Sequence, residues 1–297
     1  MTEIVFARPI HKYDSYHDFY KLAELSGFPI ISVSEIDVTR DYIVITAPMN
    51  GDYKEHFVGN LAQWEATGEI TGGQLLRQKQ SGLPRLAHLI VWNLERPGGS
   101  GSIGQYAEDS KSWIDNRFCD EVWVSDPTMA DETMLRYVVL GSDYGLGKPW
   151  DNKHYNLVHM SVTIPRRVHI YKEFNNIAPN AWPWDSPSRD EILKASKFAL
   201  NVHQDNYPFV EPLRLALFAA YGLPVISEKL NDNYPYGSDI ATHGYHGLVP
   251  ALKAALADDY DQWKEKGLRL REKMCKQLQF GKMVRKAIEE SAGIGWQ

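Results

Sequence analysis

The chain has 297 residues, 43% of them hydrophobic and 24% charged, and a formal net charge of −6 at pH 7. This size and composition predict a globular protein of two domains, and the acidic balance disfavours binding to phosphate backbones by charge alone. No apolar run approaches the roughly 18 residues of a membrane span, and the N-terminus does not resemble a signal peptide, so we expect a cytoplasmic protein with no membrane partner. Cys119 and Cys275 lie far apart and lack the spacing of zinc ligands, so we expect neither a disulfide framework nor a zinc site.

Short apolar runs alternate with longer amphipathic segments through the first half of the chain. The apolar runs predict strands at residues 3–7, 28–33, 42–47, 86–94, 121–125 and 136–140. The segments between them predict helices at residues 16–25, 106–116 and 128–134, with a glycine-broken helical region at 53–80. Strands separated by helical crossovers predict a parallel sheet with helices on both of its faces.

The second half begins after a turn-rich stretch at residues 141–154, which has no periodic pattern and predicts a linker. Strands are then predicted at residues 155–162, 176–182, 198–202 and 224–227. Helices are predicted at residues 166–174, 189–196, 212–221 and 247–257, and a long charged helix from 260 to 291. The chain is therefore expected to form two successive α/β sheets.

A strand, a polar loop and an apolar helix follow one another between residues 198 and 228. His203 and Gln204 leave the strand, and the helix starts directly after Glu211. Ligands of parallel sheets lie beyond the carboxyl ends of the strands, where helix N-termini attract anions. Arg214 is the one charged residue inside the apolar helix, so it is either ion-paired or bound to an anion. We favour an anion site over the alternative in which Arg214 only pairs with Glu211 and His203 only bonds a backbone carbonyl.

These residues resemble a known family. The stretch "LNVHQ", followed by "EPLRLALFAAYGLPVISE", resembles the donor-binding unit of GT-B glycosyltransferases, in particular the short bacterial and phage enzymes of the CgeB-like group. The stretch "YNLVHMSVTIPRR" is similar to the strand and arginine-bearing turn that open their donor domain, and "NLERPGG" and "DEVWVSD" are similar to acceptor-domain strands. The resemblance implies an α/β fold of two Rossmann-like, doubly wound parallel-sheet domains that face a cleft.

The resemblance also implies a division of labour. Residues 1–148 would form the acceptor-side domain and residues 149–280 the donor domain, with a C-terminal helix at 281–297 that crosses back to the first. The co-substrate would be a nucleoside-diphosphate sugar, preferentially a UDP-sugar, with no tightly bound cofactor and no metal. A phage-encoded enzyme of this kind would act in the host cytoplasm. Retaining members carry two glutamates separated by seven residues, but position 219 here is Ala219, so both stereochemical outcomes stay open.

Four further residues fit the donor site that the resemblance implies. Arg166 and Arg167 open a helix, where two positive charges are unfavourable unless an anion compensates them, and guanidinium groups match phosphate geometry. The alternative is a solvated helix start. Asn180 and Trp182 follow the next predicted strand, where the base or ribose would approach, although Trp182 and Trp184 also suit packing under a loop.

Transfer with inversion needs a general base that takes the proton of the acceptor hydroxyl. Glu95 is the leading candidate, because it follows an apolar strand directly and precedes a glycine-rich loop. His56 is the second candidate. In the alternative reading, Glu95 only forms a strand-end ion pair with Arg96.

The glycine-rich loop offers a different class of function. Residues Gly99 to Gly104 spell G-x-G-x-x-G between a strand and a helix, with the acidic pair Asp120 and Glu121 further on, which is the pattern of a dinucleotide site. An insertion separates the strand from the motif, whereas the dinucleotide turn is tight. An NAD(P)-dependent oxidoreductase is therefore our second hypothesis, and a nucleotide-binding module without catalysis the third.

Metal and acceptor carry weaker signals. Asp259 and Asp261 spell D-x-D, but they lie between two predicted helices, where aspartate commonly caps a helix, so we predict no metal site. Phage enzymes similar to this chain add sugars to hydroxymethylated DNA bases, which makes modified DNA one candidate acceptor. The acidic charge and the lack of a basic stripe count against DNA, and a small molecule, a glycan or a protein side chain are equally open.

Overall fold

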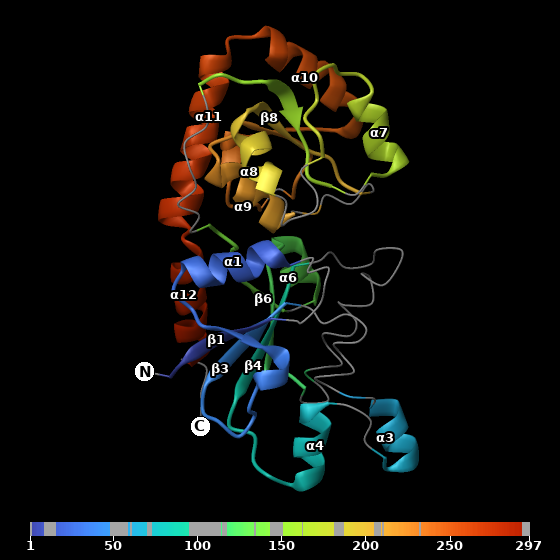
Figure 1. Ribbon diagram of the computed structural model, residues 1–297, viewed down its shortest axis with the longest axis vertical. Coiled ribbons are helices and arrows are strands. Elements are labelled where there is room, and N and C mark those ends of the chain that lie inside the picture. Colours follow the sequence, from blue (N-terminus) through green and yellow to red (C-terminus); the bar gives the residue numbers. More distant parts are fainter. Residues whose placement is uncertain are drawn as a thin grey trace. The chain divides into compact units, whose positions relative to one another are not determined.

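The computed structural model describes residues 2–8, 16–47, 59, 61–69, 73–94, 114, 118–133, 135–142, 151–161, 163–180, 187–204, 209, 211–231 and 233–292. The chain divides into two compact units. The first consists of Met1–Ser125 and Met129–Tyr137, and the second of Asp126–Thr128 and Val138–Gln297. Figure 1 colours them along the sequence, from blue at the N-terminus to red at the C-terminus.

The first unit contains a six-stranded parallel sheet in the order β2-β1-β3-β4-β5-β6. Its strands are β1 (Ile4–Arg8), β2 (Ile30–Ser32), β3 (Ile43–Thr46), β4 (His88–Asn93), β5 (Glu121–Val124) and β6 (Arg136–Tyr137). The helices of this part of the chain are α1 (His17–Leu25), α3 (Leu61–Thr67), α4 (Gln74–Ser81) and α6 (Pro127–Thr133), with a 3₁₀ turn η1 (Val33–Glu35). The predicted strands are confirmed, although β6 is shorter than expected. The helix predicted at 106–116 lies outside the described residues apart from residue 114.

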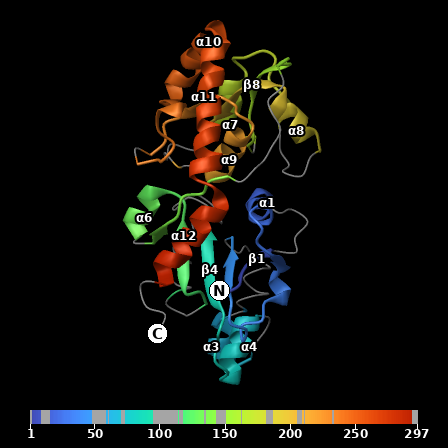
Figure 2. The same cartoon turned by 90° about the vertical axis from the view of Figure 1, so that its left-hand side faces the viewer.

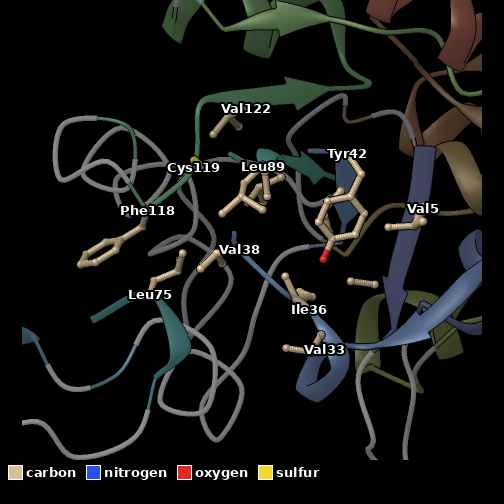
Figure 3. Close-up of a cluster of buried hydrophobic side chains, with 14 of the residues drawn as sticks. Val5, Val33, Ile36, Val38, Tyr42, Leu75, Leu89, Phe118, Cys119 and Val122 are labelled. Atoms are coloured by element: carbon tan, nitrogen blue, oxygen red, sulfur yellow. The ribbon is translucent and has the colours of Figure 1, made fainter. Parts of the chain in front are cut away.

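Both faces of this sheet are buried. One face packs into the apolar cluster of Figure 3, where Val5, Leu89 and Val122 come from three strands and Leu75 comes from α4. The alternate residues of the same strands point to the other face and build an aromatic cluster. Its ring pairs are edge-to-face, with centroids 5.4–5.5 Å apart, and join Phe6 to Phe19, Phe19 to Trp92, and Trp92 to Trp123. A strand buried on both faces reads as a continuous apolar run, which explains why β4 was visible in the sequence.

The second unit contains a four-stranded parallel sheet in the order β10-β9-β8-β7. Its strands are β7 (Tyr155–Val158), β8 (Ser196–Asn201), β9 (Val225–Glu228) and β10 (Ile240–His243). Its helices are α7 (Pro165–Tyr171), α8 (Pro187–Lys194), α9 (Pro212–Ala220), α10 (Leu248–Ala257), α11 (Tyr260–Glu272) and α12 (Phe280–Ala292), with 3₁₀ turns η2 (Gly237–Asp239) and η3 (Tyr245–Gly247). Figures 1 and 2 show helices α7 to α11 around the sheet that contains β8.

Alternation along β8 decides what each face of the second sheet meets. Phe198, Leu200 and Val202 join a cluster with Leu248 and Leu252 of α10 and with α7. The intervening residue Asn201 points to the opposite face, where its side chain meets Arg214 of α9. The sheet therefore has helices on both faces, as expected for a Rossmann-like unit.

Three expectations for the second unit were wrong. Residues 176–182 form no strand within their described part, where Ile177 makes a single bridge to Leu157. Strand β10 was missed, because the edge sequence "IATH" carries no apolar run. The long helix predicted from residue 260 is interrupted by a π-helical turn, η4 (Lys273–Gln277). Tertiary contacts account for the interruption, because Ser142 donates its amide proton to the Met274 carbonyl and the backbone of Gly141 packs against Leu278.

Helix α9 ends in a Schellman motif that touches α11. Gly222, with a φ of +65°, donates its amide proton to the Ala219 carbonyl at 2.8 Å, and Leu223 donates to Phe218 at 3.1 Å. Gly267 of α11 lies against this turn so closely that a Cβ atom there would approach the Gly222 carbonyl oxygen to 2.3 Å. The absence of a side chain at Gly267 therefore sets the distance between the two helices.

We predict that Gly267→Ala destabilises the protein by about 1–3 kcal/mol, because the obstructing atoms belong to backbone that cannot rotate away. Alanine at an ordinary helix position would instead stabilise by roughly 0.5–1 kcal/mol. The free energy of unfolding from urea titrations measures the effect. Gly244→Ala is the matched control, since its φ is −63° and no atom lies within 4 Å of the added carbon. Equal stability of the two variants would contradict the close approach.

Candidate functional site

The carboxyl ends of β8 and β9 and the beginnings of α7 and α9 bring charged side chains together in the second unit. Five of the predicted donor residues take part: Arg166, Arg167, His203, Glu211 and Arg214. Asn201 and Glu228 join them without having been predicted. We call these seven residues the charged cluster.

Glu211 lies at the centre of the charged cluster. Its Oε1 is 2.9 Å from Nη1 of Arg214 and 3.8 Å from Nη2 of Arg167, and its Oε2 is 3.2 Å from Nδ1 of His203. Burial alone would raise the pKa of Glu211, but the charge of Arg214 and the hydrogen bond and charge of His203 outweigh it and lower the pKa to about 2. The carboxylate is therefore ionised at neutral pH.

The sequence places Glu211 by fixing the start of α9. Pro212 occupies the first helical position, where its missing N–H costs nothing, so Glu211 becomes the N-cap residue. Its side chain makes no capping hydrogen bond to the helix. The carboxylate turns instead to the side chains of Arg214, Arg167 and His203.

Arg166 is held by a carboxylate that the sequence did not reveal. Its Nη1 and Nη2 donate to the two carboxylate oxygens of Glu228 at 2.6 and 2.5 Å, and Nη1 also donates to the His203 carbonyl at 3.1 Å. The guanidinium lies over the ring of Tyr245, 4.0 Å from its centroid. Glu228 ends β9 and is buried, so the bidentate pair ties α7 to the end of the sheet.

Arg167 and Arg214 share one carboxylate between them. Arg167 is buried and donates from Nε to the Val202 carbonyl at 2.9 Å. Burial and the neighbouring charge of Arg214 lower the pKa of Arg167. Arg214 donates from Nη1 to Oδ1 of Asn201 at 2.7 Å, whereas its buried Nε finds no hydrogen-bond partner among the described residues. A buried donor without an acceptor is costly, so Nε of Arg214 is a candidate hydrogen-bond donor to an anionic ligand.

The contacts that the sequence offered as structural alternatives for Arg214 and His203 are both formed. Arg214 does pair with Glu211, and Nε2 of His203 does face a backbone carbonyl, that of Lys229, at 3.0 Å. These contacts leave a surplus of positive charge, because three arginines share two carboxylates in the described part of the site. Glu228 and Glu211 thus compensate the two arginines of α7, and the positive charge of Arg214 is left in excess.

A neutral polar group adjoins the charged cluster and was missed in the sequence. The rings of His159 and Tyr171 stack with centroids 3.9 Å apart. Oγ of Ser161 lies 3.0 Å from the Tyr171 hydroxyl and 3.4 Å from Nδ1 of His159. Burial, followed by the charges of Arg214 and Arg167, lowers the pKa of His159 to about 4, so the imidazole is neutral at pH 7. The short stretch "HMS" at the end of a strand gave no spacing signal for this group.

Two further predicted residues that the structure describes, Asn180 and Gln204, are not part of the charged cluster. Asn180 donates from Nδ2 to the Ser161 carbonyl at 2.8 Å and thereby fixes the chain after β7. Gln204 is exposed. Glu95, His56, Trp182 and the loop from Gly99 to Gly104 lie outside the described residues.

The D-x-D pair is a helix cap, as predicted. Asp259 is the N-cap of α11 and accepts the amide proton of Asp261 at 3.0 Å. Across the ranges that the structure describes, no group of three or more histidine, cysteine or acidic side chains is arranged to hold a metal ion. In the same ranges, none of the helices has both the length and the apolar character needed to cross a bilayer.

Comparisons with known proteins identify solved structures that have a similar fold. No protein-family model and no curated protein sequence is similar to this chain. The structure is similar to that of Alr3699/HepE from Anabaena in complex with UDP-glucose, with a TM-score of 0.60 and 11% identity over 99% of this chain and 100% of that one. HepE in complex with UDP and glucose matches with a TM-score of 0.56 and 8% identity over 97% of this chain and 100% of that one. A chain of the GtfA/B complex matches with a TM-score of 0.48 and 10% identity, and the present chain spans 59% of its length. The predicted GT-B fold class, with two Rossmann-like parallel-sheet units, is confirmed.

We predict that Glu211→Gln lowers the free energy of unfolding at pH 7 by on the order of 3 kcal/mol, because it leaves Arg214, Arg167 and His203 without their shared anion. The folded-state pKa of about 2 lies below the ordinary 4.5, so this stabilisation is complete above pH 4.5 and is lost as the pH falls towards 2. Urea titrations of both proteins over this range should show their stabilities converge in acid.

Glu173→Gln is the control for that experiment. Glu173 pairs with Lys253 on the surface, where both side chains are about half exposed, so its loss should cost at most about 1 kcal/mol. A Glu211→Gln variant as stable as this control at pH 7 would show that the carboxylate does not hold the site together.

Proposed function

We propose that the protein is a glycosyltransferase that takes its sugar from a nucleoside-diphosphate sugar bound at the charged cluster. The observation that carries the proposal is the buried Nε of Arg214, which has no hydrogen-bond partner within the described ranges and lies near Arg167, with Glu211 as the one carboxylate that these ranges place against both guanidinium groups. A diphosphate supplies the missing acceptor and the missing negative charge. The cluster lies at the carboxyl end of a parallel sheet and the N-terminus of α9, where such ligands bind in open α/β sheets.

The similarity in fold supports a UDP-sugar as the donor. HepE, which shares this fold along its whole length, was crystallised in complex with UDP-glucose. In our proposal Arg167, Arg214 and the first amides of α9 hold the diphosphate and stabilise the charge that develops as it leaves. Arg166, committed to Glu228, fixes the start of α7 beside them. Gln204, Asn180 and Trp182 remain our candidates for contacts to the nucleoside, and His203 and Glu211 shape the diphosphate site.

The acceptor side is proposed on the sequence alone. Glu95 is our general base, with His56 as the second candidate, and the first domain carries the acceptor. We further propose that a helix at 281–297 crosses back to that domain. We also propose that the enzyme needs no metal ion and belongs to the CgeB-like group. Modified DNA is one candidate acceptor, and a phage-encoded enzyme would meet it in the host cytoplasm. A small molecule, a glycan and a protein side chain are the other candidates.

We predict that UDP and UDP-glucose stabilise the protein against heat in a panel that also contains GDP, ADP, CDP, TDP, NAD and NADP. A ligand at about 100 times its dissociation constant adds roughly 2.7 kcal/mol to the stability of the folded state. Arg214→Ala should weaken UDP binding by about 10- to 100-fold, the effect of losing a charged hydrogen bond of about 1.5–3 kcal/mol. Titration calorimetry measures the affinity.

Two variants control this experiment. Arg214→Lys keeps the positive charge but loses the fork of the guanidinium, so it should retain part of the affinity. Arg269→Ala removes an exposed arginine that pairs with Asp239, and it should leave UDP binding unchanged. Stabilisation by NAD or NADP alone would overturn the glycosyltransferase in favour of an oxidoreductase that uses the loop from Gly99 to Gly104.

A separate prediction concerns catalysis. Glu95→Gln should lower the turnover of sugar transfer by about 10²- to 10⁴-fold, the usual contribution of a general base, without changing the affinity for UDP. His56→Gln, measured in parallel, tests the second candidate. Full transfer activity of Glu95→Gln would remove Glu95 from the mechanism and leave the donor site intact.

A further inference from the structure

His203 is enclosed between two hydrogen-bond acceptors. It is buried, with 3% of its surface exposed. Nδ1 lies 3.2 Å from Oε2 of Glu211, and Nε2 lies 3.0 Å from the carbonyl oxygen of Lys229. A neutral imidazole carries one N–H and one lone pair, so one of these contacts would set a lone pair against an acceptor. The imidazolium form donates from both nitrogens and satisfies both contacts.

The charges around His203 favour this form. Glu211 faces the ring from the N-cap of α9, and Glu228 at the end of β9 accepts the amide proton of His203 at 3.1 Å. From α7, Arg166 donates to the carbonyl oxygen of His203, but its own charge is paired with Glu228. Burial alone would lower the pKa of His203, but the hydrogen bond and charge of Glu211, the Lys229 carbonyl and Glu228 outweigh it and raise the pKa above its ordinary value of 6.5.

The two oxygens of Glu211 are divided between different partners. Oε2 is occupied by His203, which leaves only Oε1 for Arg214 and Arg167. A guanidinium and a carboxylate with two available oxygens favour a bidentate pair. If the hydrogen bond from His203 were lost, Oε2 would become available to the arginines, and Glu211 would compete with a bound anion.

We propose that His203 is a positioning residue of the nucleotide site, whose imidazolium restrains Glu211 and so keeps Arg214 and Arg167 available to the diphosphate. The proposal rests on the function proposed above. It implies that the protonated form of the enzyme binds the nucleotide sugar more tightly than the deprotonated form. By linkage, nucleotide binding then takes up a proton as the pH approaches and passes the pKa of His203.

The test uses UDP-glucose, whose diphosphate has no proton to lose near neutral pH. We expect the affinity of the wild-type protein, measured by titration calorimetry between pH 6 and 9, to fall by up to about tenfold per pH unit above the pKa of His203. Calorimetry in two buffers of different ionisation enthalpy should report proton uptake in the same range. NMR titration of the imidazole signals, assigned with His203→Gln, gives the pKa of His203 in the absence of any nucleotide.

Variants separate positioning from a general structural role. His203→Gln cannot become charged, so its UDP-glucose affinity should be weaker than that of the wild type at pH 6 and should not change with pH. The same substitution on a Glu211→Gln background should cost little further affinity, because the neutral amide cannot compete as an anion for Arg214. His169→Gln, which removes an exposed histidine of α7, should behave as the wild type.

The outcomes distinguish the two proposals. Binding of UDP-glucose with no pH dependence, or an equal loss of affinity from His203→Gln on both backgrounds, overturns the role of His203 and leaves the donor site standing. Absence of binding by every protein, the wild type included, overturns the donor site and the inference together. If His203→Gln does not fold, the wild-type pH profile and the proton uptake measured in the two buffers still decide the matter.

Discussion

One carboxylate holds the candidate site together. Glu211 receives Arg167 from α7, His203 from the end of β8 and Arg214 from α9, so a single anion joins the distant helix α7 to the consecutive elements β8 and α9. Buried charges are tolerated only when they are compensated, and each of these cations depends on Glu211 for part of its compensation. The position of the Glu211 side chain therefore determines the geometry of Arg167, His203 and Arg214.

The ion pair between Arg166 and Glu228 does not depend on Glu211. Arg166 and Glu228 satisfy each other through two hydrogen bonds, and Tyr245 covers the guanidinium while its hydroxyl donates to the Arg166 carbonyl at 2.8 Å. This closed pair fixes the beginning of α7 against β9. Arg167, the next residue, is thereby held where it meets Glu211. The site thus combines the closed Arg166–Glu228 pair, which holds the start of α7, with the shared contacts of Glu211, which in our proposal leave Arg167 and Arg214 able to bind the diphosphate.

The sequence predicted what local patterns encode. Strands β4 and β8 were visible because burial on both faces makes them continuously apolar, and Arg214 stood out as the only charge in the apolar helix α9. Glu228 was missed because its partner, Arg166, lies 62 residues away and nothing near a strand end announces such a pair. The break at η4 was missed for the same kind of reason, since the helical pattern continues locally and the contacts with Gly141 and Ser142 are tertiary.

Helix α9 is bracketed at both ends. Pro212 fixes where it begins, and Gly222, locked between its own capping turn and Gly267 of α11, fixes where it stops. Each residue of an α-helix turns the chain by about 100°, so one inserted or deleted residue would swing either Arg214 or the closing turn away from its partner. A change of chain length is therefore compatible with these contacts only in the connections outside α9, and the helix keeps a constant spacing between the charged cluster and α11.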